Sequence, residues 1–165
     1  MGKNKLPSTG ALRTLRAAKV PFEVHTYRYE EGGGTATSSR ELGADEHSVI
    51  KTLIMETDAK APLIILMHGD REVSTKALAR HLGVKSIQPC KPAVAQNHSG
   101  YVVGGTSPFG TKKKLPLYAE ASIFELDTLY INGGQRGLLV SLAPSVLEAL
   151  LAPEKVQVAQ SIATD

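Results

Sequence analysis

The alternation of apolar and polar residues along this chain predicts more strands than helices. Phe22–Tyr29 alternates with a period of two, which is typical of a strand with one buried face. Leu63–Met67 is a continuous apolar run, and such a run favours a central strand that is covered on both faces. Other runs predict further strands at Val49–Glu56, Lys85–Gln88, Tyr101–Val103, Pro116–Glu120, Thr128–Ile131 and Leu138–Leu142.

Helix signals are fewer and lie between the strand signals. Ser74 is a suitable N-cap for a helix over Thr75–Leu82, which Gly83 would end. Glu30–Thr35 contains three successive glycines and predicts a flexible connection. The other helices are expected from Ser8 or Thr9 to about Lys19, over Ser38–Leu42, around Asp45–Ser48, over Pro92–Asn97 and over Pro144–Leu151.

The order of these elements predicts the fold class. Strands and helices do not alternate one for one, so the sequence favours an α+β fold with a twisted mixed, barrel-like sheet and peripheral helices over a doubly wound fold. With 165 residues, the chain is expected to form one domain over 1–165. Residues 1–7 and 153–165 are expected to be loose tails.

Two glycine-rich stretches predict rigid corners at strand ends. The first is Gly104-Gly105, which follows Tyr101–Val103 and precedes the hydroxyls of Thr106 and Ser107. Glycine can adopt a positive φ and allows backbone N–H groups to approach a ligand closely. The second corner, Asn132-Gly133-Gly134-Gln135-Arg136-Gly137, follows another strand signal. Two such corners facing one cleft would suit a carbonyl, an ester or a phosphate, although an ordinary turn also explains the first stretch.

Basic residues close to these motifs suggest an anionic ligand. Lys51 opens the otherwise apolar strand Lys51-Thr52-Leu53-Ile54-Met55, where a buried ammonium costs several kcal/mol unless it reaches solvent or an anion. It is expected to line a cleft, and an edge lysine that extends into solvent is the alternative. Lys112, Lys113 and Lys114 follow the first corner, either as a solvated face or as a rim for phosphates.

Several other chemistries are disfavoured. Gly105–Lys112 approaches a nucleotide P-loop, but Thr111 separates the second glycine from the lysine. Ser107 does not lie in a G-x-S-x-G nucleophile elbow, and Cys90, the single cysteine, is expected to be an inert thiol. The five histidines show no close ligand pairing, so no metal is expected. Without an apolar run of membrane-spanning length or a signal core, the protein is expected to be cytoplasmic and to contact no membrane.

At this point the motifs match a known family. The chain resembles the YbaK/ProX aminoacyl-tRNA deacylases, the free-standing relatives of the editing domain inserted in bacterial prolyl-tRNA synthetases. The resemblance covers nearly the whole chain, and the glycine-glycine-x-serine-proline block is its most specific part. The matching blocks are Val20-Pro21-Phe22, His25-Thr26-Tyr27, Ile50-Lys51-Thr52-Leu53, Lys76-Ala77-Leu78-Ala79, Gly100–Gly110, Tyr130–Gly137 and Leu142-Ala143-Pro144.

The resemblance implies a six- or seven-stranded mixed sheet and an ester hydrolysis without metal or cofactor. It implies that Lys51 contacts the 3′-terminal nucleotide and is needed for activity. It also implies that the backbone of Gly104 and Gly105 holds the ester, and that water or the thiol of a cysteinyl substrate attacks it. The implied substrate-binding residues are Tyr27, Tyr101, Thr106, Ser107, Asn132, Gly133, Gly134 and Arg136, with Lys112, Lys113 and Lys114 as the tRNA rim.

The expected function is therefore trans-editing of mischarged tRNA, with Cys-tRNA(Pro) as the favoured substrate. The expected partners are the aminoacylated acceptor end and prolyl-tRNA synthetase. Arg28-Tyr29 and Asn132 depart from the residues usual in this family, which weakens the assignment of cysteine relative to that of deacylation. The alternatives are a binding module without turnover, associated with prolyl-tRNA synthetase, a deacylase for another amino acid such as alanine, and a hydrolase of small esters.

Overall fold

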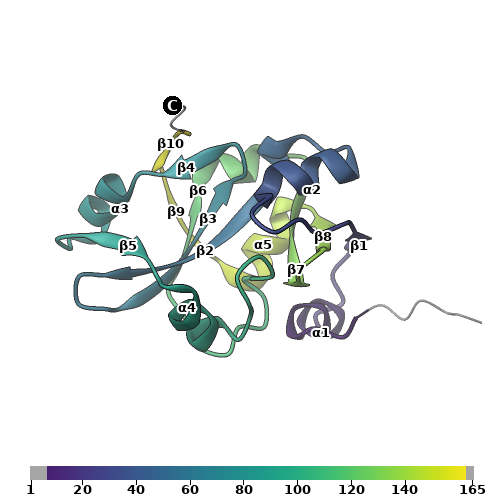
Figure 1. The fold of residues 1–165 in the computed structure, drawn as a ribbon, viewed down its shortest axis with the longest axis horizontal. Coiled ribbons are helices and arrows are strands. Elements are labelled where there is room, and N and C mark those ends of the chain that lie inside the picture. Colours follow the sequence, from purple (N-terminus) through teal and green to yellow (C-terminus); the bar gives the residue numbers. More distant parts are fainter. Residues whose placement is uncertain (1–6, 163–165) are drawn as a thin grey trace, which may run out of the picture.

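A computed structural model describes residues 7–162 and shows a mixed eight-stranded sheet at the centre of the molecule (Figure 1). The hydrogen-bonded order is β1-β8-β7-β2-β3-β6-β9, and β5 pairs with β2 away from this path. The strands are β1 (Glu23–Thr26), β2 (Val49–Thr57), β3 (Pro62–His68), β5 (Ile87–Pro89), β6 (Leu117–Glu120), β7 (Leu129–Gln135), β8 (Leu138–Leu142) and β9 (Glu154–Val156). A separate two-stranded ladder joins β4 (Arg71–Val73) to β10 (Ala159–Ser161).

Helices surround this sheet, and local capping defines several of their ends. The Thr9 side chain accepts a hydrogen bond from the Leu12 N–H at the start of α1, and Ser74 caps α3 in the same way. Gly83 ends α3 in the left-handed region at φ 70°. The helices are α1 (Gly10–Ala17), α2 (Gly34–Leu42), α3 (Thr75–Leu82), α4 (Pro92–Ser99) and α5 (Pro144–Leu151), with 3-10 turns η1 (Glu46–Ser48) and η2 (Ala121–Glu125).

The hairpin of β2 and β3 is buried on both faces. Its antiparallel register runs from Ile50 opposite His68 to Glu56 opposite Pro62. Because side chains alternate along a strand, Leu66 joins the core cluster that contains α1 and α5 residues, while Ile65 joins the cluster that contains α3 residues. This two-sided burial explains the continuous apolar run of β3, which the sequence predicted as a central strand.

The α+β class and the mixed sheet are confirmed, and the structure also has two short strands at the C-terminal end that the sequence did not suggest. Residues after Pro153 were expected to be a loose tail, but β9 pairs with β6 and β10 pairs with β4. That prediction is wrong because these short strands depend on tertiary contacts. The buried side chain of Val158 packs in the α3-side core cluster. Of the expected N-terminal tail, residues 1–6 lie outside the described part of the chain.

The glycine-rich stretches also differ from the prediction. Tyr101–Val103 is not a strand, because this part of the chain between α4 and β6 forms a loop without regular secondary structure. Its β-branched side chains misled the prediction: Val102 and Val103 are 41% and 47% exposed, whereas Tyr101 is buried. Gly133 and Gly134 do not follow a strand either, since both lie inside β7, where the register with β8 shifts between Asn132 and Gln135.

Two boundaries and one further strand differ from the prediction. β1 ends at Thr26 rather than Tyr29, and α2 begins at Gly34 within the expected flexible connection. The strand β4 was not predicted because its three residues carry too short a pattern to recognise.

Among residues 7–162, no helix combines the length and the apolar character that crossing a membrane requires.

Candidate functional site

The two glycine-rich stretches contact each other directly. The side-chain amide of Asn132 donates a hydrogen bond to the Gly104 carbonyl at 3.0 Å. The Arg136 Nε donates to the Val103 carbonyl, also at 3.0 Å. The loop after α4 and the β7–β8 hairpin therefore form one site, which we call the double-glycine site and define by Gly104, Gly105, Gly133 and Gly134.

Glycine is required at Gly104 and Gly105 for different reasons. Gly104 has a φ of 89°, which side chains rarely adopt. At Gly105 an added Cβ would lie 2.9 Å from the backbone nitrogen of Arg136 and 3.0 Å from the carbonyl carbon of Gln135. The missing side chain at Gly105 thus allows the loop backbone to pack against the hairpin backbone.

Hydrogen bonding within the protein decides which backbone donors remain for a ligand. The N–H of Gly105 donates to the Val102 carbonyl at 2.9 Å, and that of Gly134 donates to Asn132 Oδ1 at 2.7 Å. Within residues 7–162, no hydrogen bond uses the N–H of Gly104 or that of Thr106. Gly104 and Thr106 therefore offer free backbone donors in the described part of the chain, whereas the N–H groups of Gly105 and Gly134 are already occupied.

Two predicted substrate contacts instead support the loop from inside. Ser107 is fully buried, and its hydroxyl accepts a hydrogen bond from the Phe109 N–H at 3.1 Å. Tyr101 is also buried and donates its hydroxyl to the Phe109 carbonyl. Thr106 is partly exposed, and its hydroxyl donates to the Val102 carbonyl at 3.3 Å. These bonds hold the turn in shape, and they place Ser107 away from any direct contact with a substrate.

The segment after β1 packs against the same site. The Tyr27 N–H donates to the Gly137 carbonyl at 2.9 Å, and burial raises the pKa of the Tyr27 phenol. Tyr29 was not predicted as a site residue, yet its ring lies 5.2 Å from the Arg136 guanidinium carbon. A Cβ at Gly104 would lie 2.8 Å from the Tyr29 hydroxyl. The sequence offered one indication that Tyr29 belongs to the site, namely that it departs from the residue usual at this position in the family.

Lys51 shares a face of the sheet with Asn132. In the parallel pairing of β2 with β7, Ile50 lies opposite Ile131, so the residues that follow each of them leave the sheet on the same side. The Lys51 ammonium donates to the Arg71 carbonyl on β4. Burial lowers the pKa of this ammonium, although the carboxylates of Glu46, Glu72 and Asp70 act in the opposite direction.

Thr52 follows Lys51 on β2, so its side chain lies on the opposite face of the sheet from Lys51 and Asn132. Its hydroxyl oxygen is buried, and it is the one buried side-chain polar atom for which residues 7–162 provide no hydrogen-bond partner. Leaving a buried hydroxyl unpaired costs about 1–3 kcal/mol.

The predicted lysine rim follows the double-glycine site along the loop. Lys112, Lys113 and Lys114 are all exposed. The Lys112 N–H donates to the Ser99 carbonyl at 2.9 Å, and the Lys113 N–H donates to the His98 carbonyl at 3.2 Å. The base of the loop is thus tied to the end of α4, while the three ammonium groups remain on the surface.

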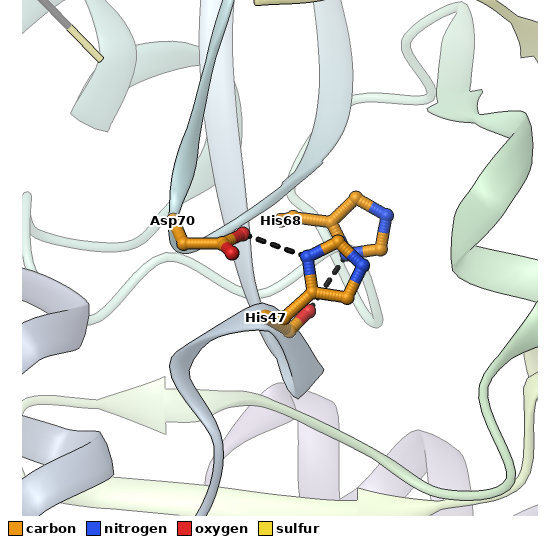
Figure 2. A group of neighbouring side chains, drawn as sticks. All are labelled: His47, His68 and Asp70. Atoms are coloured by element: carbon orange, nitrogen blue, oxygen red, sulfur yellow. Dashed lines mark hydrogen bonds and ion pairs between the residues drawn. The ribbon is translucent and has the colours of Figure 1, made fainter. Parts of the chain in front are cut away.

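The fold brings together two histidines that show no close pairing along the chain. His47 and His68 stack with ring centroids 3.7 Å apart and planes 6° from parallel, and Asp70 lies beside them (Figure 2). The His47 Nδ1 lies 2.8 Å from the Asp70 carboxylate. Spacing along the chain could not show this cluster, because the β2–β3 hairpin brings His68 back beside η1.

The geometry of this cluster does not fit a shared metal ion. The His68 Nδ1 donates to the His47 carbonyl at 2.7 Å, and its Nε2 lies 2.7 Å from the Ser122 hydroxyl. Both ring nitrogens of His68 are therefore already engaged. An ion must also lie in the plane of each imidazole that binds it, and two stacked parallel rings do not share such a position. We read the cluster as a structural contact between η1, β3 and η2.

Cys90 lies apart from these groups. Its burial, and then its hydrogen bond and charge interaction with Glu56, raise the pKa of the thiol to about 11. Because the thiolate is the nucleophilic form, this thiol is poorly suited to catalysis at neutral pH.

Comparison with known proteins identifies related chains. The sequence model described as the aminoacyl-tRNA editing domain matches residues 30–150. EbsC of Enterococcus faecalis, whose name proposes deacylation of Cys-tRNA(Pro) and Cys-tRNA(Cys), is 30% identical over 152 residues, which cover 91% of this chain and 93% of that protein. The proline–tRNA ligase of Thermodesulfovibrio yellowstonii is 29% identical over 136 residues, which cover 82% of this chain and 22% of the ligase.

A solved structure with the same fold agrees with these matches. A crystal structure described as a candidate trans-editing enzyme for prolyl-tRNA synthetase superimposes with a TM-score of 0.81 and covers 94% of this chain and 100% of that one. Its sequence is only 18% identical, so this likeness establishes the fold and not the substrate.

Proposed function

Because the chain belongs to the aminoacyl-tRNA editing domain family, we propose that it hydrolyses the ester of mischarged tRNA at the double-glycine site, with Cys-tRNA(Pro) as its substrate. The observation that carries the proposal is the contact between the two glycine stretches, 3.0 Å from the Asn132 amide to the Gly104 carbonyl. It lies beside backbone N–H groups for which residues 7–162 provide no partner. The name of EbsC supports the choice of cysteine.

The proposed reaction depends on backbone donors. A water molecule attacks the ester carbonyl, and the carbonyl oxygen becomes an oxyanion. The N–H groups of Gly104 and Thr106 donate to this oxyanion, and one such donor contributes about 3–4 kcal/mol in comparable enzymes. The bond to the ribose oxygen then breaks, the ribose oxygen takes a proton, and the free amino acid and intact tRNA leave.

The side chains around the site position the substrate in this proposal. Lys51 provides positive charge toward the phosphate of the terminal nucleotide, on the sheet face that it shares with Asn132. Asn132 and Arg136 hold the loop carbonyls against the hairpin. Tyr27 and Tyr29 border the opening beside Gly137 and Gly104.

The test is release of amino acid from a panel of charged tRNAs, with Cys-tRNA(Pro), Ala-tRNA(Pro) and Pro-tRNA(Pro) as members. The parent is expected to release cysteine and to spare proline. Lys51→Ala is expected to lower kcat/KM for Cys-tRNA(Pro) by about a hundredfold, because positioning of the terminal nucleotide is lost. Lys155→Ala removes an equal charge at an exposed site over Phe124 and should leave the rate unchanged.

The other outcomes distinguish the alternatives. Tight binding of charged tRNA without loss of the ester would replace the enzyme by a binding module. Release of alanine in preference to cysteine would keep the deacylase and change its substrate. If Lys51→Ala hydrolyses Cys-tRNA(Pro) as fast as the parent, the assignment of this lysine is wrong. A physical association with prolyl-tRNA synthetase stays a prediction, since the ligase match covers only a fifth of that enzyme's length.

A further inference from the structure

Charge is distributed unevenly along the chain. The segment from Val73 to Ala119 contains no aspartate or glutamate. Its lysines and arginines give it a formal charge of +7, whereas the whole chain carries +3, so the remainder is net negative. All seven are exposed, and they are Lys76, Arg80, Lys85, Lys91, Lys112, Lys113 and Lys114.

The acid-free segment occupies one side of the fold. It includes α3, β5, α4 and the loop of the double-glycine site, and Figure 1 shows the first three along the left and lower edge of the molecule. Acids from elsewhere reach its α3 end, where Glu154 pairs with His81 and Asp58 accepts from the Lys85 N–H. In the described part of the chain, no ion pair involves Lys91 or the three lysines of the rim.

A hollow opens at the α4 end of this side, where no ion pair in the described part of the chain neutralises the lysines. It has a volume of about 500 Å³ and is lined by Ala93, Gln96, Asn97, Gly100 and Lys112, and we call it the α4 hollow. Its polar side chains are two amides and one ammonium. Amides can hydrogen-bond the edges of nucleobases, and an ammonium can pair with a phosphate. Val94 and Val102, which border it along the chain, are 36% and 41% exposed.

The α4 hollow lies close to the proposed site of ester cleavage. Gly100 lines the hollow and Gly104 belongs to the double-glycine site, so four peptide steps separate them. An extended chain of that length spans at most about 15 Å. A strand of a few nucleotides can therefore reach from one to the other, with its phosphates passing the exposed ammonium groups.

We propose that the α4 hollow binds single-stranded RNA, namely the nucleotides that precede the terminal adenosine of the acceptor end. One base enters the hollow beside Gln96 and Asn97, and Lys112 and Lys114 pair with the flanking phosphates. The inference rests on the proposed function for the identity of the RNA. It adds a second contact point, which holds the strand while the ester lies between Gly104 and Thr106.

The experiment measures binding of an uncharged hairpin RNA that ends in a single-stranded CCA, by fluorescence anisotropy over a range of salt concentrations. Each phosphate contact to single-stranded nucleic acid contributes about −0.7 to the slope of log K against log salt. Lys112→Ala and Lys114→Ala are each expected to weaken binding severalfold and to reduce the slope by about 0.7. Lys155→Ala, the control of equal charge, should change neither.

Gln96→Ala tests whether the hollow reads a base. It should weaken binding of the hairpin with the CCA overhang and leave binding of a blunt hairpin unchanged, because only the overhang offers an unpaired base. Asn97→Ala should behave in the same way. Both side chains are exposed, so neither change threatens the fold.

The two hypotheses fail separately in this design, because the RNA carries no ester. A parent that binds the overhang but never releases an amino acid would defeat the proposed function and leave the RNA site intact. Equal binding by the parent, Lys112→Ala and Gln96→Ala, with one common salt slope, would overturn the inference. Losses that are the same for the overhang and for the blunt hairpin would also overturn it, since they would reflect general electrostatic attraction.

Discussion

The side-chain amide of Asn132 serves both glycine stretches at once. Its nitrogen donates to the Gly104 carbonyl, while its oxygen accepts from the N–H groups of Gly134 at 2.7 Å and Gln135 at 3.1 Å. An amide is suited to this position because it carries a donor and an acceptor on one planar group. Serine, which the family resemblance would place here, has a shorter side chain and a single oxygen.

Replacing this amide by a carboxylate tests its role. Asn132→Asp keeps the acceptor for Gly134 but loses the donor, and it places a negative charge against the Gly104 carbonyl. The loop and the hairpin should move apart, and kcat/KM for deacylation should fall by about a hundredfold, as for a displacement of about 1 Å at an active site. Stability should fall by about 1–3 kcal/mol, measured by urea unfolding.

The matched control is Gln135→Glu, which adds the same charge at a neighbouring exposed side chain. Its deacylation rate and stability should stay close to those of the parent. A normal rate in Asn132→Asp would show that the contact between the two stretches is not needed for catalysis.

Residue types at the site could be predicted, but the roles of individual atoms could not. The pairing of Gly104 with a second glycine stretch followed from two similar motifs. Which N–H groups remain for a ligand depends on partners distant in sequence, and Asn132 occupies the donor of Gly134. For the same reason no pattern along the chain distinguished the buried hydroxyl of Ser107 from an exposed one.

At the scale of elements, local signals were sufficient where the chain encodes its own boundaries. The helix Thr75–Leu82 begins at a serine cap and ends at a left-handed glycine, and both are confirmed. The strand Leu138–Leu142 also has the predicted bounds. Elements that depend on distant partners were missed, because a three-residue strand such as β9 pairs with β6 and is buried in the core cluster on the α3 side.

The C-terminal strands are expected to contribute to stability. Val156 is 4% exposed and packs in the core cluster that includes Leu78 of α3. Glu120 also depends on this region, since its carboxylate accepts from the N–H groups of Val158 and Ala159. Val156→Ala should therefore lower the free energy of unfolding by about 2 kcal/mol, measured by urea titration.

Val102→Ala removes the same two methyl groups at a position that is 41% exposed, and it should change stability by less than about 0.5 kcal/mol. Equal stabilities of the two variants would restore the original expectation of a loose C-terminal tail.

At the scale of the whole molecule, His68 joins elements that are distant in sequence. It lies at the end of β3, is 1% exposed and contacts His47 of η1 and Ser122 of η2. Burial lowers the pKa of His68 below its usual 6.5, although the hydrogen bond to the His47 carbonyl acts in the opposite direction. The carbonyl of His47 requires a proton on Nδ1, so a neutral ring leaves Nε2 to accept from the Ser122 hydroxyl.

The sign of the pH dependence follows from this neutral ring. Below about pH 6.5 the unfolded chain protonates His68 while the folded protein does not, so the unfolded state binds more protons and stability falls as the pH falls. His68→Gln removes this proton uptake. The drop in free energy of unfolding between about pH 7.5 and about pH 5.5 should be smaller in the variant than in the parent.

Urea unfolding at the two pH values measures this difference. Because the decrease in the free energy of unfolding is compared within each protein, the effect of the substitution on stability at a single pH cancels. The pKa of Asp70 lies below its usual 3.8, because hydrogen bonding to His47 and the charge of Arg71 outweigh the effect of burial, so this carboxylate titrates outside the range. His98→Gln replaces a half-buried histidine outside the stacked pair and is the control substitution. An equal drop in the parent and in His68→Gln would mean that His68 is protonated in the folded protein, with the stacked pair opened to admit the charge.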